Sequence, residues 1–256
     1  MSGAAAKVVD DTKIEGSFDS GGRLWGGPTK VKVFFVMEFS KPFESVSGWN
    51  ERGNQKNSSQ IYGSKQMTRR DSMDYGVVVQ SYWDAPTAGL TANYQVAAGD
   101  QILVKMAISY TSIENAWENL NTDLDHWDFD LVQKNAEHEW NQILQRIEVK
   151  GGSDQQQIKF YTDLWHVLLG RKIINDVKGT YPDYTQGEKD WKFTKADLKI
   201  KMLPMNKSGK SLFNMYNSDA LWLTHWNLNI IWGLAWPEIL DDFSASLVQY
   251  AKNGGL

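Results

Sequence analysis

The chain has 256 residues, of which 41% are hydrophobic and 23% charged, and its formal net charge is -4. This balance is typical of a globular protein with one large domain or two ordinary ones, and it provides no basic field for nucleic acid. No apolar run approaches the ~18 residues that a membrane span requires. The absence of cysteine excludes disulfides, a thiolate nucleophile and a zinc–thiolate site. The first seven residues show no apolar core of a signal peptide.

The first part of the chain predicts β-structure. Residues 31–40 are rich in β-branched and aromatic side chains and lie between Gly27-Pro28 and Lys41-Pro42. The segment is apolar on nearly both faces, which indicates a strand buried between two layers.

Other segments of this part predict shorter strands. We expect them at residues 77–80, 91–96 and 101–109. The last two would form a hairpin whose turn is Ala97-Ala98-Gly99-Asp100. The polar stretch 50–70 predicts a long connection or a solvated hairpin. Several short strands separated by turns indicate an antiparallel β-sandwich.

The hydrophobic period changes to that of a helix near Tyr110. Capping boxes at Thr111-x-x-Glu114 and Ser153-x-x-Gln156 predict two helix starts. Four acidic residues interrupt the pattern: Asp123, Asp125, Asp128 and Asp130. We interpret them as a loop or the cap of a further helix, and less readily as a cation site.

The rest of the chain predicts a loop followed by two helices. Residues 179–209 resemble a loop, and residues 216–235 are apolar and Trp-dense, which predicts a buried helix. A last helix begins at Pro237 and ends at Asn253-Gly254-Gly255. Because the chain stops there with no partner for this helix, we expect a truncated polypeptide.

Strands therefore precede helices, which predicts an α+β fold of two domains rather than a doubly wound one. Residues 1–112 are assigned to part of an N-terminal antiparallel β-sandwich. Residues 113–256 are assigned to linker helices and the first part of a helical domain, truncated at its C-terminal end.

Local motifs do not identify a catalytic site. The sequence contains no phosphate-binding loop, no zinc-protease motif and no nucleophile elbow. Glycoside hydrolysis requires two carboxyl groups, but 31 acidic residues are too many to select a pair by counting. The twelve Trp suit a large core, and some of them suit stacking against a sugar ring.

Several segments together resemble one family. They are Phe160 to Leu169, Asn175 to Tyr181, Asn217 to Trp222, Trp236-Pro237-Glu238, Tyr250 to Leu256, Phe34 to Phe43 and Ala98-Gly99-Asp100. In order and spacing they are similar to glycoside hydrolase family 92, along nearly the whole chain.

The resemblance implies a calcium-dependent, inverting exo-α-mannosidase, bacterial and acting on N-glycans or yeast mannan. It implies an N-terminal β-sandwich and a C-terminal (α/α)6 barrel, of which residues 113–256 would supply the first helices, with the active site between the two domains. The partner would be a mannose-containing oligosaccharide or glycoprotein glycan, with neither nucleic acid nor membrane involved. The expected location is periplasmic or extracellular.

The resemblance also limits what this chain contributes. The family's acid, its base and much of its Ca2+ site lie beyond the Gly254-Gly255 segment, so no catalytic residue is assigned here and the metal ligands stay unassigned. Many members read Ser-x-Trp-Asp-Thr-x-Arg where this chain has Ala220-Leu221-Trp222-Leu223-Thr224-His225-Trp226. Leu223 and Trp226 thus replace a sugar-contacting Asp and Arg.

Six residues are candidate substrate contacts: Trp222, Asp219, His225, Trp226, Trp25 and Asn253. For Trp222, sugar stacking and core packing are equally supported, and for Asn253 and Asp176 a cap or loop role is the alternative. Two other functions stay open for the whole chain, a non-catalytic carbohydrate-binding protein and a structural protein whose Trp residues only form a core.

Overall fold

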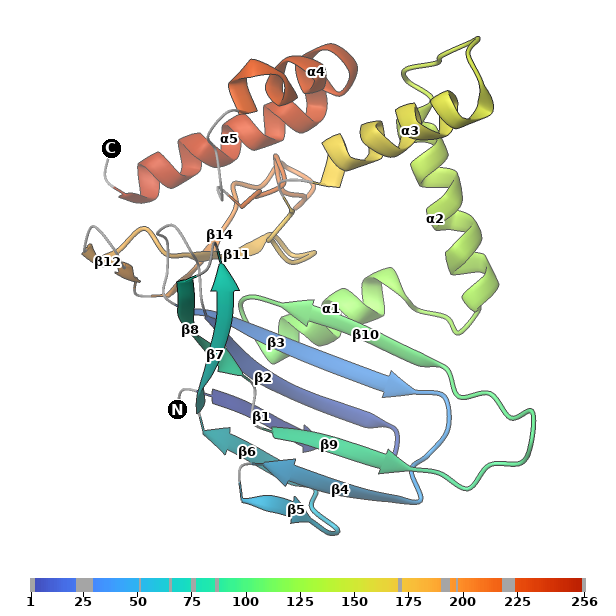
Figure 1. Ribbon diagram of the computed structural model, residues 1–256, viewed down its shortest axis with the longest axis vertical. Helices are drawn as coiled ribbons and strands as arrows, with labels where there is room; N and C mark the ends of the chain where they lie inside the picture. Colours follow the sequence, from blue (N-terminus) through green and yellow to red (C-terminus); the bar gives the residue numbers. More distant parts are fainter. Residues whose placement is uncertain are drawn as a thin grey trace. The chain divides into compact units, whose positions relative to one another are not determined.

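Strands occupy the first part of the chain and helices most of the second (Figure 1). The computed structural model describes residues 3–21, 30–50, 52–64, 66–74, 77–85, 88–169, 172–189, 194–196, 198–217 and 224–254. By its contacts the chain divides into two units. The first comprises Met1–Trp127 with Asp176–Met202, and the second comprises Asp128–Asn175 with Leu203–Leu256.

The elements have the following bounds. The strands are β1 Gly3–Val8, β2 Lys13–Gly21, β3 Lys30–Phe39, β4 Ser45–Asn50, β5 Gly53–Gln55, β6 Gln60–Ser64, β7 Gln66–Asp74, β8 Val77–Ala85, β9 Ala88–Asn93, β10 Val104–Ser109, β11 Thr180–Asp183, β12 Gly187–Lys189, β13 Thr194–Ala196 and β14 Lys199–Met202. The helices are α1 Ile113–Asp123, α2 Phe129–Leu144, α3 Asp154–Leu169, the 3₁₀ turn η1 Thr224–Trp226, α4 Leu228–Ala235 and α5 Pro237–Gly254.

The first unit is built on an antiparallel sheet of five strands in the order β10-β3-β2-β1-β6 (Figure 1). A second sheet, β5-β4-β9, lies against the β1 and β6 end of the first. Ile61 of β6 is buried and approaches Gly48 of β4, where the absence of a side chain makes room for it. The expected arrangement of antiparallel strands followed by helices is confirmed.

Helix α1 covers the other face of the five-stranded sheet. Val36 of β3 is fully buried against Ala116 and Leu120 of α1. Trp117 donates a 2.8 Å hydrogen bond from its indole to the Glu15 carboxylate on β2, which also forms a 2.7 Å ion pair with Lys7. The strand at residues 31–40 therefore lies between two layers, as its apolar faces predict.

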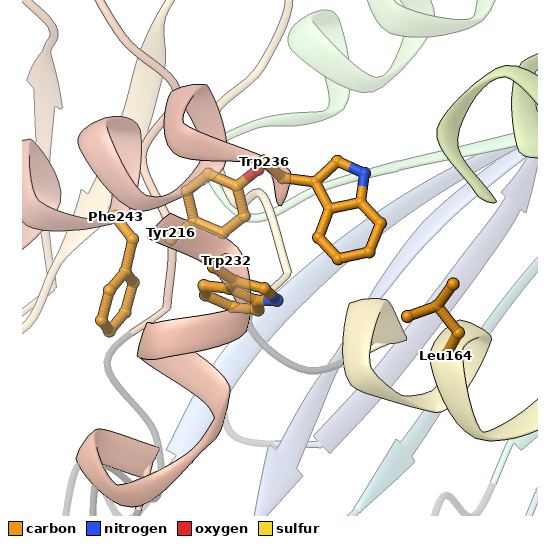
Figure 2. Close-up of a cluster of buried hydrophobic side chains, with 5 residues drawn as sticks. All are labelled: Leu164, Tyr216, Trp232, Trp236 and Phe243. Atoms are coloured by element: carbon orange, nitrogen blue, oxygen red, sulfur yellow. The ribbon is translucent and has the colours of Figure 1, made fainter. Parts of the chain in front are cut away.

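The second unit has an aromatic core of its own. Figure 2 shows Trp232 and Trp236 of the α4 segment beside Tyr216 and Phe243, with Leu164 contributed by α3. Both indole N–H groups find backbone acceptors at 3.2 Å, on Val167 for Trp232 and on Ile143 for Trp236. Buried Trp usually satisfies its single donor in this way, so the rings contribute apolar contact without an unpaired N–H.

The predicted hairpin of residues 91–109 is wrong. The strands exist, but β9 pairs with β4 and β10 pairs with β3, so they belong to different sheets. The turn itself is present, since the Asp100 N–H bonds the Ala97 carbonyl at 3.1 Å and Gly99 has φ +90°. The turn lies inside a connection of residues 94–103. β10 then pairs with the edge of β3, so that the apolar residues of β10 lie opposite those of β3.

Strands also lie in the segment predicted as a long connection or a solvated hairpin, residues 50–70, and in the segment predicted as a loop, residues 179–209. Residues 50–70 include β5, β6 and the start of β7, and in β6 the single apolar residue Ile61 is enough to anchor an otherwise polar strand. Residues 179–209 form two small antiparallel pairs, β11 with β14 and β12 with β13. Their strands are three or four residues long, which is too short for a hydrophobic period to be visible.

The helix boundaries are partly as expected. Asp128 caps α2 by accepting from the Leu131 N–H at 2.9 Å, so the break at residues 123–128 is confirmed. Both hydrogen bonds of the predicted capping box form at α3: the Ser153 N–H donates to the Gln156 side chain, and the Gln156 N–H donates to the Ser153 hydroxyl. At α1 the cap is Ser112 rather than Thr111. The helix predicted over residues 216–235 is wrong in extent, because Tyr216 lies in a β-bridge and α4 has only eight residues.

The predicted boundary between residues 112 and 113 stays a prediction.

Within the part of the chain that the structure describes, no helix combines the length and apolar character that crossing a membrane demands.

Candidate functional site

The sequence-predicted sugar contacts fall into two groups. Trp25, Asp219 and Trp222 lie outside the residues that the structure describes. The structure describes the other three, His225, Trp226 and Asn253, and all of them belong to the second unit. Their role as substrate contacts stays a prediction.

His225 and Trp226 occupy the 3₁₀ turn that leads into α4. Trp226 is 67% exposed, the opposite of the buried Trp232 six residues later. The His225 and Trp226 rings touch edge to face, with centroids 5.5 Å apart. An exposed indole held by a neighbouring ring presents a rigid apolar face beside a polar imidazole, a combination that suits the C–H face and the hydroxyls of a pyranose.

Asn253 lies in the last turn of α5. Its side-chain carbonyl accepts a 3.0 Å hydrogen bond from Gln249, one turn earlier. This bond joins two side chains one turn apart on the same helix, so both the cap role and the sugar-contact role of Asn253 stay predictions.

An open groove runs along α3 in the same unit. It has a volume of about 730 Å³. Its lining residues are Asp154, Gln157, Ile158, Tyr161, Thr162 and Trp165. Trp140 of α2 packs against Trp165 with centroids 6.1 Å apart. Aromatic rings beside a carboxylate and an amide are also suited to binding a sugar, and the helical period of these residues gave no sign of the groove.

The segment Asp176 to Tyr181 belongs to the first unit, and its first residue is a buried carboxylate. Asp176 is 3% exposed. It accepts hydrogen bonds from Thr111, from Asn115 at 3.2 Å, from Asn119 at 2.8 Å and from Thr180 at 2.9 Å. Three of these donors converge on one carboxylate oxygen and Asn119 bonds the other, so both oxygens are held by donors of the chain itself. The loop role of Asp176 is therefore confirmed.

A second buried carboxylate is Asp183 at the end of β11. It is fully buried, forms a 2.9 Å ion pair with Lys201 of β14 and accepts from the Thr185 N–H at 3.2 Å. The cation and the backbone N–H compensate much of the cost of removing the charge from water. Asp183 thus joins β11 to β14 through its ion pair with Lys201.

The acidic side chains of the described residues are scattered. In that part of the chain, no three Asp, Glu or His side chains gather in a way that could hold a metal ion. Asp128, one of the four acidic residues considered as a possible cation site, caps α2 instead.

Comparison with protein families gives two matches that divide the chain. Residues 1–109 match the glycosyl hydrolase family 92 N-terminal domain, and residues 115–256 match the glycosyl hydrolase family 92 catalytic domain. The chain belongs to glycosyl hydrolase family 92. Its predicted fold class, antiparallel sheets followed by helices, is that of the two-domain family 92 fold.

Solved structures agree in fold. A family GH92 inverting mannosidase from Bacteroides thetaiotaomicron superposes with a TM-score of 0.73 at 20% identity, over 99% of this chain and 29% of that protein. A GH92 alpha-mannosidase of the same organism gives a TM-score of 0.68 at 19% identity, over 97% of this chain and 28% of that one. The chain thus spans less than a third of either. No curated protein is similar enough in sequence to count as a match.

Proposed function

We propose that this family 92 glycoside hydrolase chain is part of an exo-acting α-mannosidase that cleaves mannose-containing glycans. The observation that carries the proposal is the match of both family domains, in order, along the chain. It is supported by the solved relatives, which are described as an inverting mannosidase and an alpha-mannosidase, the latter also in complex with mannoimidazole. The proposed location is periplasmic or extracellular.

We assign no acid or base to this chain. An inverting enzyme places the two carboxyl groups about 6.5–9.5 Å apart so that a water molecule fits between them. Asp176 and Asp183 are the two fully or nearly fully buried aspartates of the described residues, and both are already engaged by donors of the chain. These contacts give both residues a structural role, so neither is assigned as acid or base.

The proposed calcium dependence has no counterpart among the described residues, which assemble no carboxylate cluster. We therefore assign no Ca2+ ligand among these residues. No step of the reaction is therefore derived through the ion.

The proposed contribution of this chain is one wall of the sugar site. Trp226 would supply a stacking face at a position where many members of the family have Arg. His225, one residue earlier, would supply a polar contact. Trp222, Asp219, Trp25 and Asn253 complete the proposed set. An indole in place of a guanidinium exchanges charged hydrogen bonds for apolar contact, so we expect a different preference at this subsite.

The test is hydrolysis of α-1,2-, α-1,3- and α-1,6-linked mannobiose, each in the presence of Ca2+ and of EDTA. It is run on the 256-residue chain and on any longer product of the same gene. Activity that depends on both the longer product and the ion supports the proposal. Activity of the short chain would show that the acid and base lie within it, and inactivity of both would remove the mannosidase assignment.

Non-catalytic carbohydrate binding is the second candidate, and the groove along α3 favours it. This function predicts that the chain binds mannosides without hydrolysing any of them. Substituting Trp165 by Ala would then abolish binding, whereas the Trp226→Ala variant would retain it. The mannosidase proposal predicts instead that Trp226→Ala weakens mannoside binding and that Trp165→Ala retains it.

A further inference from the structure

The first unit contains a cavity between its two sheets. It has a volume of about 470 Å³ and is lined by residues of β1, β2, β3 and β9 and by Tyr94. This volume lies within the ~300–1,000 Å³ of small-molecule sites. None of its lining residues is among the mannoside contacts proposed above.

Small residues on facing strands create the cavity. Side chains alternate along a strand, so Ala4 and Ala6 share one face of β1, and Ala88 and Ala92 share one face of β9. All four line the cavity. Leu90 is the longest side chain that β1 and β9 contribute to the lining, so neither strand places a ring in the cavity, and the Phe residues of the lining belong to β2 and β3.

The lining is apolar with two exceptions. Apart from Ser17 and Tyr94, every lining residue is Ala, Gly, Ile, Leu, Met or Phe. None carries a charge, so the site provides nothing to hold an ion. A sugar would leave most of its hydroxyls without partners there, and burying unpaired polar groups is unfavourable.

Tyr94 supplies one specific polar group. Its ring packs against Phe43 and Phe39, with centroids 5.8 and 6.4 Å away. Its hydroxyl is buried and finds no hydrogen-bond partner among the described residues. Burial also raises the pKa of Tyr94, so the hydroxyl keeps its proton at neutral pH and can donate as well as accept. Buried hydroxyls normally have a partner. Almost none of the surface of this oxygen is accessible, so a ligand provides the partner once the Tyr94 side chain turns toward the cavity.

We propose that this cavity binds a small, neutral, apolar molecule of up to three rings that forms a single hydrogen bond with the Tyr94 hydroxyl. The apolar lining selects against ions and sugars, and the hydroxyl selects among apolar molecules for those with one polar group. The proposal goes beyond the glycosidase function and does not depend on it.

The probe is N-phenylnaphthylamine, which is neutral, has one N–H and fluoresces strongly only in apolar surroundings. Titrated into the 256-residue chain, it is expected to bind at a single saturable site with enhanced, blue-shifted emission. Ala92→Phe places a ring inside the cavity and is expected to weaken binding by at least about tenfold. Thr91→Phe adds the same ring on the exposed face of the same strand, and its affinity should equal that of the wild type.

Tyr94→Phe tests the hydrogen bond while keeping the shape of the side chain. It should weaken binding of N-phenylnaphthylamine by about three- to tenfold. Binding of naphthalene, which has no polar group, should not change. This variant also keeps the test valid if Ala92→Phe does not fold, as judged by circular dichroism.

The proposal is overturned if the wild-type chain shows no saturable binding. It is equally overturned if folded Ala92→Phe and Tyr94→Phe variants bind the probe as the wild type does, since the probe would then occupy another apolar surface.

Discussion

Asn119 and Asp176 are 57 residues apart in the sequence, and the Asn119 amide donates a 2.8 Å hydrogen bond to the Asp176 carboxylate. The same Asn119 side chain accepts from the Val177 N–H at 3.0 Å. One residue of α1 thus holds both the side chain and the backbone of the loop that follows α3. Asn115, one turn earlier, reaches the same carboxylate and Thr180.

Replacing Asp176 by Ala is expected to destabilise the chain by about 3 kcal/mol, because several buried donors lose their acceptor at once. Urea unfolding measures the change. Asp163→Ala is the control: Asp163 forms an exposed pair with Lys159, for which a loss below about 0.5 kcal/mol is expected. If the two variants lose the same stability, the Asp176 cluster does not hold the loop.

A pH effect is expected at the start of α1. The pKa of Glu114 is lowered, chiefly by a hydrogen bond from its own backbone N–H and then by one with the Ser112 side chain. A carboxyl group with a lowered pKa in the folded state stabilises the protein above its ordinary pKa of 4.5 and loses this contribution as pH falls. Thermal midpoints measured between pH 6 and pH 3 should therefore fall less for Glu114→Gln than for the wild type. The stability that ionised Glu114 contributes is small because this side chain is mostly exposed to solvent. If the thermal midpoints of the two proteins fell in parallel, the prediction would be contradicted.

The core strand and most helices follow from the sequence because they depend on local patterns. The stretch 31–40 has a continuous apolar run, and Asp128 and Ser153 mark helix starts at the residues where the structure has them. Pairing partners do not follow, since the turn at Ala97 to Asp100 is correct and yet β9 and β10 join different sheets. Which sheet a strand joins depends on edges formed by distant residues, and no local pattern encodes them.

The candidate site shows the same limit. A Trp-dense segment predicts either core or sugar contacts, and the structure separates Trp232, which is buried, from Trp226, which is exposed. The Asp176 cluster joins residues more than 55 positions apart, so sequence spacing gives no sign of it. The cavity beside Tyr94 depends on small residues of β1 and β9 facing one another across two sheets.

Gly16 on β2 is expected to tolerate no side chain. A Cβ there would lie 2.3 Å from the Ala5 carbonyl oxygen and 2.6 Å from the Phe35 ring. The backbone contact cannot be relieved by rotating a side chain, so we expect Gly16→Ala to cost about 2 kcal/mol, as overpacked positions do. Gly48→Ala is the matched control, because its nearest atoms belong to the Ile61 side chain, the closest at 3.2 Å, and can shift. Equal losses in the two variants would show that strand glycines matter here only for entropy.

Trp232 and Trp226 should respond differently to the same substitution. Trp232→Ala removes a ring that is 1% exposed and its hydrogen bond to Val167, so a loss of about 3–5 kcal/mol is expected. Trp226→Ala removes an exposed ring and should change the free energy of unfolding by less than about 0.5 kcal/mol. Denaturant titration gives both values, and a large loss for Trp226→Ala would show that its ring serves packing rather than binding.

Mannoside affinity completes the comparison of the two Trp residues. In the form of the protein that binds methyl α-mannoside by calorimetry, Trp226→Ala should weaken binding by about tenfold, and Trp226→Phe should retain most of it because a ring face remains. Leu234→Ala, at a position of α4 that is 82% exposed, should leave affinity unchanged. If Trp226→Ala binds as well as Leu234→Ala does, the exposed indole is not a sugar contact and the wall proposed for this subsite lies elsewhere.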